Sequence, residues 1–164
     1  SSIFFFSMIL PPPRSTLFPS RTLFRSPWLL DMTVPESAID QLGHANNCEY
    51  LRWLEDIAWA HSRHLGLGFE QYQAFNRAMV ARQTELEYLA AAFAGDDLQI
   101  GTWIVENNKR ISMVRRYQIV RPADGVTLLR GRTRWVCVAL DSGKPKRLPQ
   151  EYVDAYAVTA VEQP

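Results

Sequence analysis

Apolar residues recur at spacings of three and four along residues 47–65, which is the pattern of a helix with one buried face. The residues on this face are Leu51, Leu54, Ile57, Ala58, His61 and Leu65. Asn46 or Asn47 can cap the helix, because an Asn side chain accepts a hydrogen bond from a free backbone N–H one turn in. Gly66 follows, and Gly commonly stands just past the end of a helix.

The other apolar runs are shorter and are separated by turn residues, which predicts strands. We expect a first strand over residues 28–34, which continues after Pro35 over residues 36–40. A short helix or turn is expected over residues 67–76. Four further strands are expected over 79–93, 98–105, 111–120 and 126–140, and then a tail or short helix over 148–156. Gln83, Glu85 and Glu87 share one parity, which predicts a single wet face for their strand.

Short connections make antiparallel neighbours, and the helix can bury its apolar face only on the sheet. The sequence therefore predicts an α+β fold, with an antiparallel sheet of about five strands wrapped around one long helix. Residues 27–164 are expected to form this single domain. Residues 1–26 are set apart as disordered and non-native in appearance, similar to translated sequencing adapter, because three prolines follow a short apolar run that no positive charge precedes.

Composition sets limits on function. The chain has 164 residues, 47% hydrophobic and 21% charged, which is typical of a globular domain. A net charge of +1 gives no reason to expect a nucleic acid or an anionic membrane as partner, and no apolar run has the roughly 20 residues of a membrane span. The two cysteines, Cys48 and Cys137, form no Cys-x-x-Cys pair and are expected to be free thiols of a cytoplasmic protein. No nucleotide-binding, serine-elbow or zinc pattern occurs, so we expect no cofactor and no metal.

Asp40 lies a few residues before the start of the long helix. A helix N-terminus offers unpaired N–H groups and a positive partial charge, so a carboxylate beside it is suited to attack on an acyl group. By residue type alone, Asp40 can equally be a loop residue that caps a turn. Glu55 can likewise be a solvated helix residue, and His44 a residue that shapes the loop by hydrogen bonds.

A motif surrounds Asp40, and it reads Asp40-x-x-Gly43-His44-x-Asn46-Asn47 followed by Tyr50-Leu51-x-x-Leu54-Glu55. It resembles the hotdog-fold acyl-CoA thioesterases of the 4-hydroxybenzoyl-CoA thioesterase type. Residues 134–138 and 142–149 are similar to the final strand and exit of that family, and the likeness runs from about residue 28 to the C-terminus. Ala38 stands where many relatives have a second acidic residue.

The resemblance implies that Asp40 is the nucleophile or general base and that the backbone N–H of Asn47 polarises the thioester carbonyl. It further implies that His44 helps to position the substrate and that Glu55 is the second choice as catalytic carboxylate. The residues expected to contact substrate are Gly43, Asn46 and Tyr50. Relatives place their sites at dimer interfaces and some form tetramers. The apolar residues Trp135, Val136, Val138 and Leu140 in the last strand independently suggest a homodimer, because they are more apolar than a solvent edge would be.

The expected reaction is hydrolysis of an acyl-CoA thioester to a free acid and CoA. A non-catalytic module that binds acyl thioesters, and a thioesterase acting on acyl-carrier protein, are the alternatives. Five aromatic residues are candidates either for lining an acyl pocket or for packing in the core. They are Trp53, Trp59, Phe69, Tyr72 and Phe75. The candidates for binding the CoA phosphates are Lys109, Arg110, Arg115, Arg116, Lys144, Lys146 and Arg147.

Overall fold

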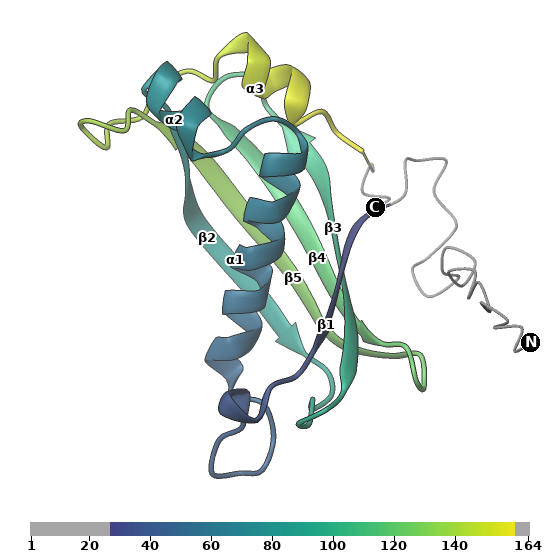
Figure 1. Ribbon diagram of the computed structural model, residues 1–164. Coiled ribbons are helices and arrows are strands. Elements are labelled where there is room, and N and C mark those ends of the chain that lie inside the picture. Colours follow the sequence, from purple (N-terminus) through teal and green to yellow (C-terminus); the bar gives the residue numbers. More distant parts are fainter. Residues whose placement is uncertain (1–26, 160–164) are drawn as a thin grey trace, which may run out of the picture.

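The computed structural model describes residues 27–159. Residues 1–26, for which an expectation was stated above, and the last five residues lie outside the described part of the chain. Its elements follow the predicted order (Figure 1). They are β1 (Trp28–Thr33), the 3-10 helix η1 (Glu36–Ala38), α1 (Asn47–His64), α2 (Phe69–Phe75), β2 (Ala78–Tyr88), β3 (Asp97–Asn107), β4 (Ser112–Arg121), β5 (Val126–Val138) and α3 (Gln150–Ala155).

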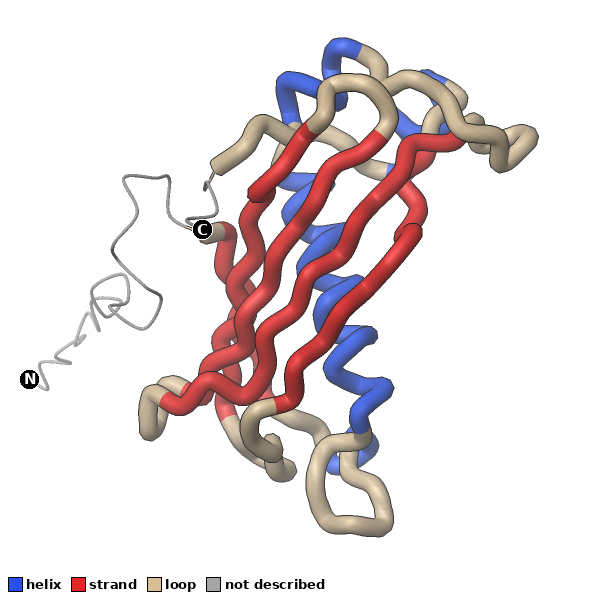
Figure 2. The backbone as a smooth tube through the Cα atoms, turned by 180° about the vertical axis from the view of Figure 1, so that it is seen from behind, coloured by secondary structure: helices blue, strands red, loops and turns tan. Residues whose placement is uncertain are grey.

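All five strands belong to one antiparallel sheet with the order β1-β3-β4-β5-β2. The long helix α1 runs along one face of this sheet (Figure 1), and the view from behind shows the opposite face with no helix over it (Figure 2). The predicted α+β fold is therefore confirmed. Since α1 must bury an apolar face and the sheet is the one large surface available to it, helix and sheet share a single core.

The buried face of α1 is shifted relative to the prediction. Tyr50 and Trp53 are buried and their rings pack 5.0 Å apart, whereas Leu51 is 41% exposed, so its predicted place in the core is wrong. The helix therefore buries the face that carries the aromatic side chains of Tyr50 and Trp53. Gly131 of β5 lets the helix come close, because a Cβ there would lie 3.1 Å from Cδ1 of Leu54.

The predicted continuation of the first strand over 36–40 is wrong. The chain instead makes the 3-10 turn η1, in which the N–H groups of Ala38 and Ile39 donate to the carbonyls of Pro35 and Glu36. Ile39 then pairs with Ala45 in an isolated antiparallel bridge. This bridge closes residues 40–44 into a compact loop immediately before α1.

Strand β2 is an edge of the sheet, and most of its side chains are exposed on both faces. A bulge between Ala81 and Gln83 breaks the alternation, so the prediction of a single wet face is wrong. Strand β5 lies in the interior of the sheet between β4 and β2. Trp135 and Val138 of this strand are apolar because they lie in the core. The argument that their apolar character indicates a dimer interface is therefore also wrong.

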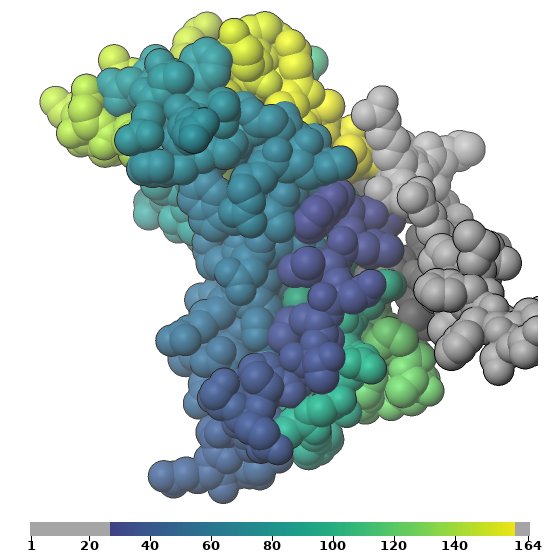
Figure 3. Space-filling view, in the orientation of Figure 1, coloured from purple at the N-terminus to yellow at the C-terminus, as the bar shows by residue number. Residues whose placement is uncertain are grey.

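The C-terminal segment closes the end of the helix–sheet layer at which α1 finishes (Figure 3). The hydroxyl of Tyr156 donates to Oγ of Ser62 at 2.9 Å, and the N–H of Thr159 donates to the carbonyl of Ile104 at 2.9 Å. The loop that carries Asp40 lies at the opposite end of α1 and projects from the molecule (Figures 1 and 3).

Candidate active site

The loop before α1 holds Asp40 half-buried at its base. Its Oδ1 accepts a hydrogen bond of 2.8 Å from the N–H of Leu42, and its backbone N–H donates to the carbonyl of His44 at 3.0 Å. Gly43 lies exposed at the turn with a φ of 78°, a left-handed conformation that glycine adopts without strain. The carboxylate is therefore held by its own loop and does not swing freely.

One side chain joins this carboxylate to the helix. Asn46 is the N-cap of α1, and its Oδ1 accepts from the N–H of Cys48 at 2.9 Å. Its Nδ2 donates to Oδ2 of Asp40 at 3.4 Å. Asn47 is the first helical residue, and the N–H groups of the first turn have no partner within the helix. The N–H of Cys48 is taken by the cap and that of Glu49 donates to the carbonyl of Asn46 at 2.9 Å, whereas the N–H of Asn47 has no acceptor among the described residues. This free N–H lies next to the residue that contacts the Asp40 carboxylate.

His44 lies half-buried on the same loop, where its Nδ1 is 3.3 Å from the carbonyl oxygen of Ala45. This contact needs a proton on Nδ1, so in the neutral ring Nε2 is left as the acceptor. Its place beside Asp40 fits a role in positioning substrate.

Tyr50 and Glu55 lie further along α1. Tyr50 is 2% exposed and its hydroxyl accepts a hydrogen bond of 2.9 Å from the N–H of Ala92, so its contact is internal to the chain. Glu55 is half-buried and lies eight residues, or about 12 Å along the axis, beyond the start of α1. Burial raises the pKa of its carboxyl, Asp56 adds to this, and Arg115 opposes it. The structure therefore separates Glu55 from the Asp40 loop.

The loop that joins β2 to β3 supports this site, although no pattern in the sequence points to it. The carbonyl of Ala92 accepts from the N–H of Ala45 at 2.8 Å, while the N–H of Ala92 donates to Tyr50. One residue thus holds both the Asp40 loop and the first turn of α1.

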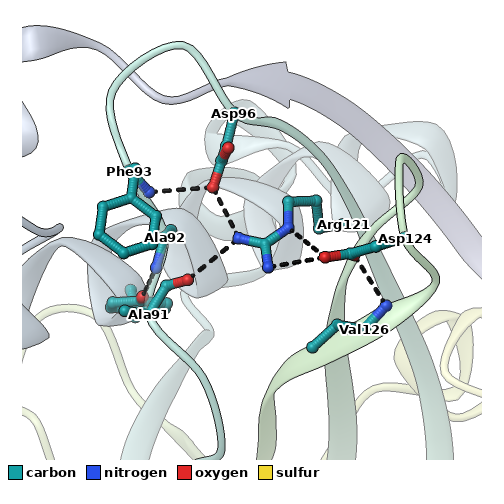
Figure 4. A network of polar contacts seen from close by, with 8 residues as sticks. Ala91, Ala92, Phe93, Asp96, Arg121, Asp124 and Val126 are labelled. Atoms are coloured by element: carbon teal, nitrogen blue, oxygen red, sulfur yellow. Dashed lines mark hydrogen bonds and ion pairs between the residues drawn. The ribbon is translucent and has the colours of Figure 1, made fainter.

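Arg121 in turn fixes the β2–β3 loop (Figure 4). Its NH1 donates to the carbonyl of Ala91 at 3.2 Å and to Oδ2 of Asp96 at 2.9 Å. Its Nε and NH2 donate to Oδ2 of Asp124 at 3.0 and 2.8 Å, and this contact lowers the pKa of Asp124. Arg121 is 25 and 30 residues from the two groups it binds on that loop, so no local pattern could have identified it.

The site lies beside the open edge of the sheet. The hydroxyl of Tyr88, at the end of β2, donates to the carbonyl of Asn47 at 3.1 Å, and its ring meets Tyr50 edge-on at 5.5 Å. Exposed apolar side chains occur on the elements that surround the loop. They are Leu42 (78% exposed), Leu51 (41%), Tyr88 (44%), Leu89 (44%) and Phe93 (50%).

The basic residues are distributed differently. Arg115 is 1% exposed, so its candidacy for the CoA phosphates is wrong. Lys109 and Arg110 are exposed in the β3–β4 turn, and the residues exposed in the loop after β5 are Lys144, Lys146 and Arg147. The two segments are joined by a bond from the N–H of Leu148 to the carbonyl of Arg110 at 2.7 Å, and within one chain they lie at the end opposite the Asp40 loop (Figure 1).

Two findings bear on other kinds of site. Within residues 27–159, no three His, Cys, Asp or Glu side chains are grouped so that they could hold a metal ion. In the same part of the chain, no helix has both the length and the apolar character that crossing a membrane requires.

Comparison with known proteins identifies the family. A family model described as the thioesterase-like superfamily matches residues 34–156, which include the Asp40 loop and α1. The chain belongs to this superfamily. The match confirms the family-level prediction of a hotdog-fold thioesterase. No curated protein matches the chain in sequence.

Solved structures, among them named thioesterases, share the fold. A 1,4-dihydroxy-2-naphthoyl-CoA thioesterase from Synechocystis is 20% identical with a TM-score of 0.70, over 78% of this chain and 93% of that one. The probable thioesterase YbaW from Escherichia coli is 24% identical with a TM-score of 0.67, over 77% and 94%. The protein SAV2348 from Staphylococcus aureus, solved in complex with CoA, is 13% identical with a TM-score of 0.78, over 88% and 94%.

Proposed function

We propose that this protein hydrolyses acyl-CoA thioesters, with Asp40 as the catalytic carboxylate and the N-terminus of α1 as the group that polarises the carbonyl. The observation that carries the proposal is the side chain of Asn46, which caps α1 and also contacts Asp40. It keeps a carboxylate close to the N–H of Asn47, which has no acceptor among the described residues, and acyl transfer needs this pair of functions. The membership in a thioesterase superfamily supports the reaction class.

The reaction has two routes that this geometry supports. As a general base, Asp40 takes a proton from a water molecule while the water oxygen attacks the thioester carbon. As a nucleophile, its oxygen attacks that carbon directly, and the mixed anhydride that results is then hydrolysed by water. In both routes the carbonyl oxygen becomes negative near the N–H of Asn47, the carbon–sulfur bond breaks, and the CoA thiolate leaves and takes up a proton.

Substrate contacts follow from the same loop. Gly43 leaves room for close approach at the turn, His44 offers a ring nitrogen beside Asp40, and Asn46 orients the carboxylate. Tyr50 acts indirectly, because its hydroxyl holds the β2–β3 loop. Both cysteines are free thiols, which agrees with action in a reducing compartment such as the cytoplasm.

The test is release of free CoA from a panel of short, long and aromatic acyl-CoA thioesters by the full chain and by Asp40→Asn. An Asn side chain keeps the Oδ1 that accepts from Leu42, so this variant removes the charge and preserves the turn. We expect the rate on the best substrate to fall by about 10²–10⁴-fold, the range for loss of a general acid or base. Asp40→Ala should lose the same activity and also loosen the loop.

Glu36→Gln is the matched control, because Glu36 is an exposed carboxylate four residues earlier on the same segment. It should keep full activity, as should Glu55→Gln. Full activity in Asp40→Asn would refute the assignment, and loss of activity in Glu55→Gln would transfer it to Glu55. Binding of an acyl-CoA without turnover would favour a binding module, and turnover only of acyl-carrier protein would change the substrate class.

A further inference from the structure

A positively charged side chain is buried in the core without a counter-ion among the described residues. Arg115 of β4 is 1% exposed, and within residues 27–159 no carboxylate oxygen forms an ion pair with it. Its NH1 donates to Nδ1 of His61 at 2.7 Å and lies 3.4 Å from Oγ1 of Thr102, while its buried Nε has no hydrogen-bond partner. An isolated buried charge is costly, so native structures pair such groups or neutralise them.

The neighbours of Arg115 do not neutralise it. Nδ1 of His61 accepts a hydrogen bond from the guanidinium, and burial together with Arg115 lowers the pKa of His61 to about 3, so His61 stays neutral and contributes no negative charge. The ring of Tyr156 lies 6.0 Å from the guanidinium carbon and offers a weak cation–π contact. Glu55 is half-buried and interacts with Arg115 electrostatically, but it makes no direct contact.

A small cavity of about 20 Å³ adjoins the guanidinium. It is lined by Ala58, Trp59, Ser62, Tyr72, Met79, Met113, Arg115, Trp135 and Tyr156, all of them buried except the half-buried Trp59. The volume is enough for one or two water-sized species, since one water needs roughly 10–15 Å³ by the same measure. No acidic side chain of the described residues lines the cavity. Its polar groups are the guanidinium of Arg115, the hydroxyls of Ser62, Tyr72 and Tyr156, and the indole N–H groups of Trp59 and Trp135, of which that of Trp135 is buried without a partner.

Of these hydroxyls, that of Ser62 can donate into the cavity. Tyr156 donates to Oγ of Ser62 at 2.9 Å, which leaves the hydroxyl hydrogen of Ser62 free to point elsewhere. Burial raises the pKa of Tyr72, so its hydroxyl stays protonated, and its hydrogen is donated to the hydroxyl oxygen of Tyr156 at 3.4 Å. A guanidinium and the free hydroxyl hydrogen of Ser62, surrounded by aromatic and sulfur-containing side chains, favour a negatively charged occupant over a positively charged one.

We propose that this cavity binds one small monovalent anion, either a halide ion or a small carboxylate, as the counter-ion of Arg115. The site lies near the C-terminal end of α1, whereas Asp40 lies before its N-terminus, so anion binding here is separate from thioester chemistry. Its consequence is stability, because a ligand that binds only the folded state stabilises it by mass action.

The experiment is thermal unfolding of the full chain at constant ionic strength, with sodium gluconate replaced stepwise by sodium chloride, sodium bromide or sodium formate. Gluconate is too large for the cavity. We expect the Tm to rise with the small anion, by about 3–6 °C at ten times its dissociation constant. The chloride and formate arms show whether the occupant is a halide or a carboxylate. Crystals soaked in bromide should give an anomalous peak beside Arg115.

Arg115→Met should lose the dependence on the small anion, and Ser62→Ala should weaken it. Arg63→Met is the matched control, because it removes one positive charge from the exposed face of α1 and should keep the full response. If Arg115→Met does not fold, the bromide peak and Ser62→Ala still decide the outcome. No Tm response to any small anion, or the same response in Ser62→Ala and the wild type together with no bromide peak, overturns the proposal.

Discussion

His61 shows how strongly a single position in α1 depends on its surroundings. It is 7% exposed, its ring stacks on Trp28 at a centroid distance of 5.7 Å, and its Nδ1 accepts from Arg115. A proton on Nδ1 would break that hydrogen bond and place two positive charges in contact. Burial first, and Arg115 second, therefore lower the pKa of His61 from 6.5 to about 3.

This shift predicts a pH dependence of stability. The unfolded chain takes up a proton on His61 near pH 6.5, whereas the folded chain resists protonation until about pH 3. The contribution of neutral His61 to the free energy of unfolding is therefore fully present above pH 6.5 and is lost as the pH falls from 6.5 toward 3. Denaturant unfolding should show a loss of at most about 1.4 kcal/mol per pH unit from this one proton.

The variant His61→Gln tests this, because Gln keeps an oxygen that can accept from Arg115 but does not titrate. Its free energy of unfolding should fall less steeply than that of the wild type between pH 6.5 and 3. His64→Gln is the control, since His64 is exposed on the same helix, and it should follow the wild type. Parallel curves for His61→Gln and the wild type would contradict the assignment.

At the scale of one element, the N-terminus of α1 combines stability with the proposed chemistry. Asn46 accepts from the N–H of Cys48 through Oδ1 and donates to Asp40 through Nδ2. An Asp at this position is an equally good N-cap and favours the positive end of the helix, but it cannot donate and it adds a second negative charge. The two roles can therefore be separated by substitution.

We predict that Asn46→Asp keeps the stability of the wild type to within about 0.5 kcal/mol, because the cap is preserved. Its thioesterase rate should fall by about tenfold or more, as expected when a hydrogen bond to a charged group is lost. Asn46→Ala should lose both stability and thioesterase rate, with a cost of about 1 kcal/mol in unfolding free energy. Urea unfolding and CoA release, measured on the same preparations, give the two quantities. Full activity in Asn46→Asp would show that its contact with Asp40 has no role.

The elements were predictable from the sequence where their causes are local. The helix over 47–65, the turn glycines and the N-cap depend on neighbours within one turn, and they were predicted within one or two residues. The bulge at Ala81 and the 3-10 turn after Pro35 depend on how the chain meets the rest of the sheet, and the sequence could not specify them.

The same distinction applies to the candidate site. A short motif brings Asp40, His44, Asn46 and Asn47 together, so the sequence could predict their proximity. Ala92 lies 42 positions from Tyr50, to which it donates, and Arg121 lies 25 and 30 positions from the two groups it binds on the β2–β3 loop. Nothing in the local sequence of either residue marks this support. The prediction that Arg115 binds phosphate was wrong because it assumed that a charged side chain lies on the surface. Arg115 is buried because it lies on β4 and faces α1.

At the scale of the whole molecule, the open edge of β2 suggests a second copy of the chain. This edge strand is 11 residues long, it pairs only with β5 among the described elements, and Val80 on it is 42% exposed. The other edge, β1, has only 6 residues. Long unprotected edges readily pair with another strand, and an isologous pair formed through β2 would join two sheets into one.

Such a pair would also affect the proposed site. Tyr88 at the end of β2 contacts Asn47, so the Asp40 loop lies next to the edge that would be covered. Because a two-fold pair of antiparallel edge strands reverses the second copy, the end of that copy with the exposed basic residues would come toward the Asp40 end of the first. In such a homodimer the second copy would bring positive charge toward the Asp40 loop, which is consistent with the phosphate groups of CoA.

The dimer makes a final prediction about mass and activity together. The full chain should sediment at twice its monomer mass, and CoA release per chain should fall on dilution as the dimer dissociates. Val80→Lys should weaken the dimer and lower activity in parallel, because a lysine on an edge strand opposes strand pairing. Val126→Lys is the matched control, since Val126 is similarly exposed at 36% but begins the interior strand β5, and it should leave mass and activity unchanged. A wild-type monomer that keeps full activity on dilution would exclude a role for the β2 edge in catalysis.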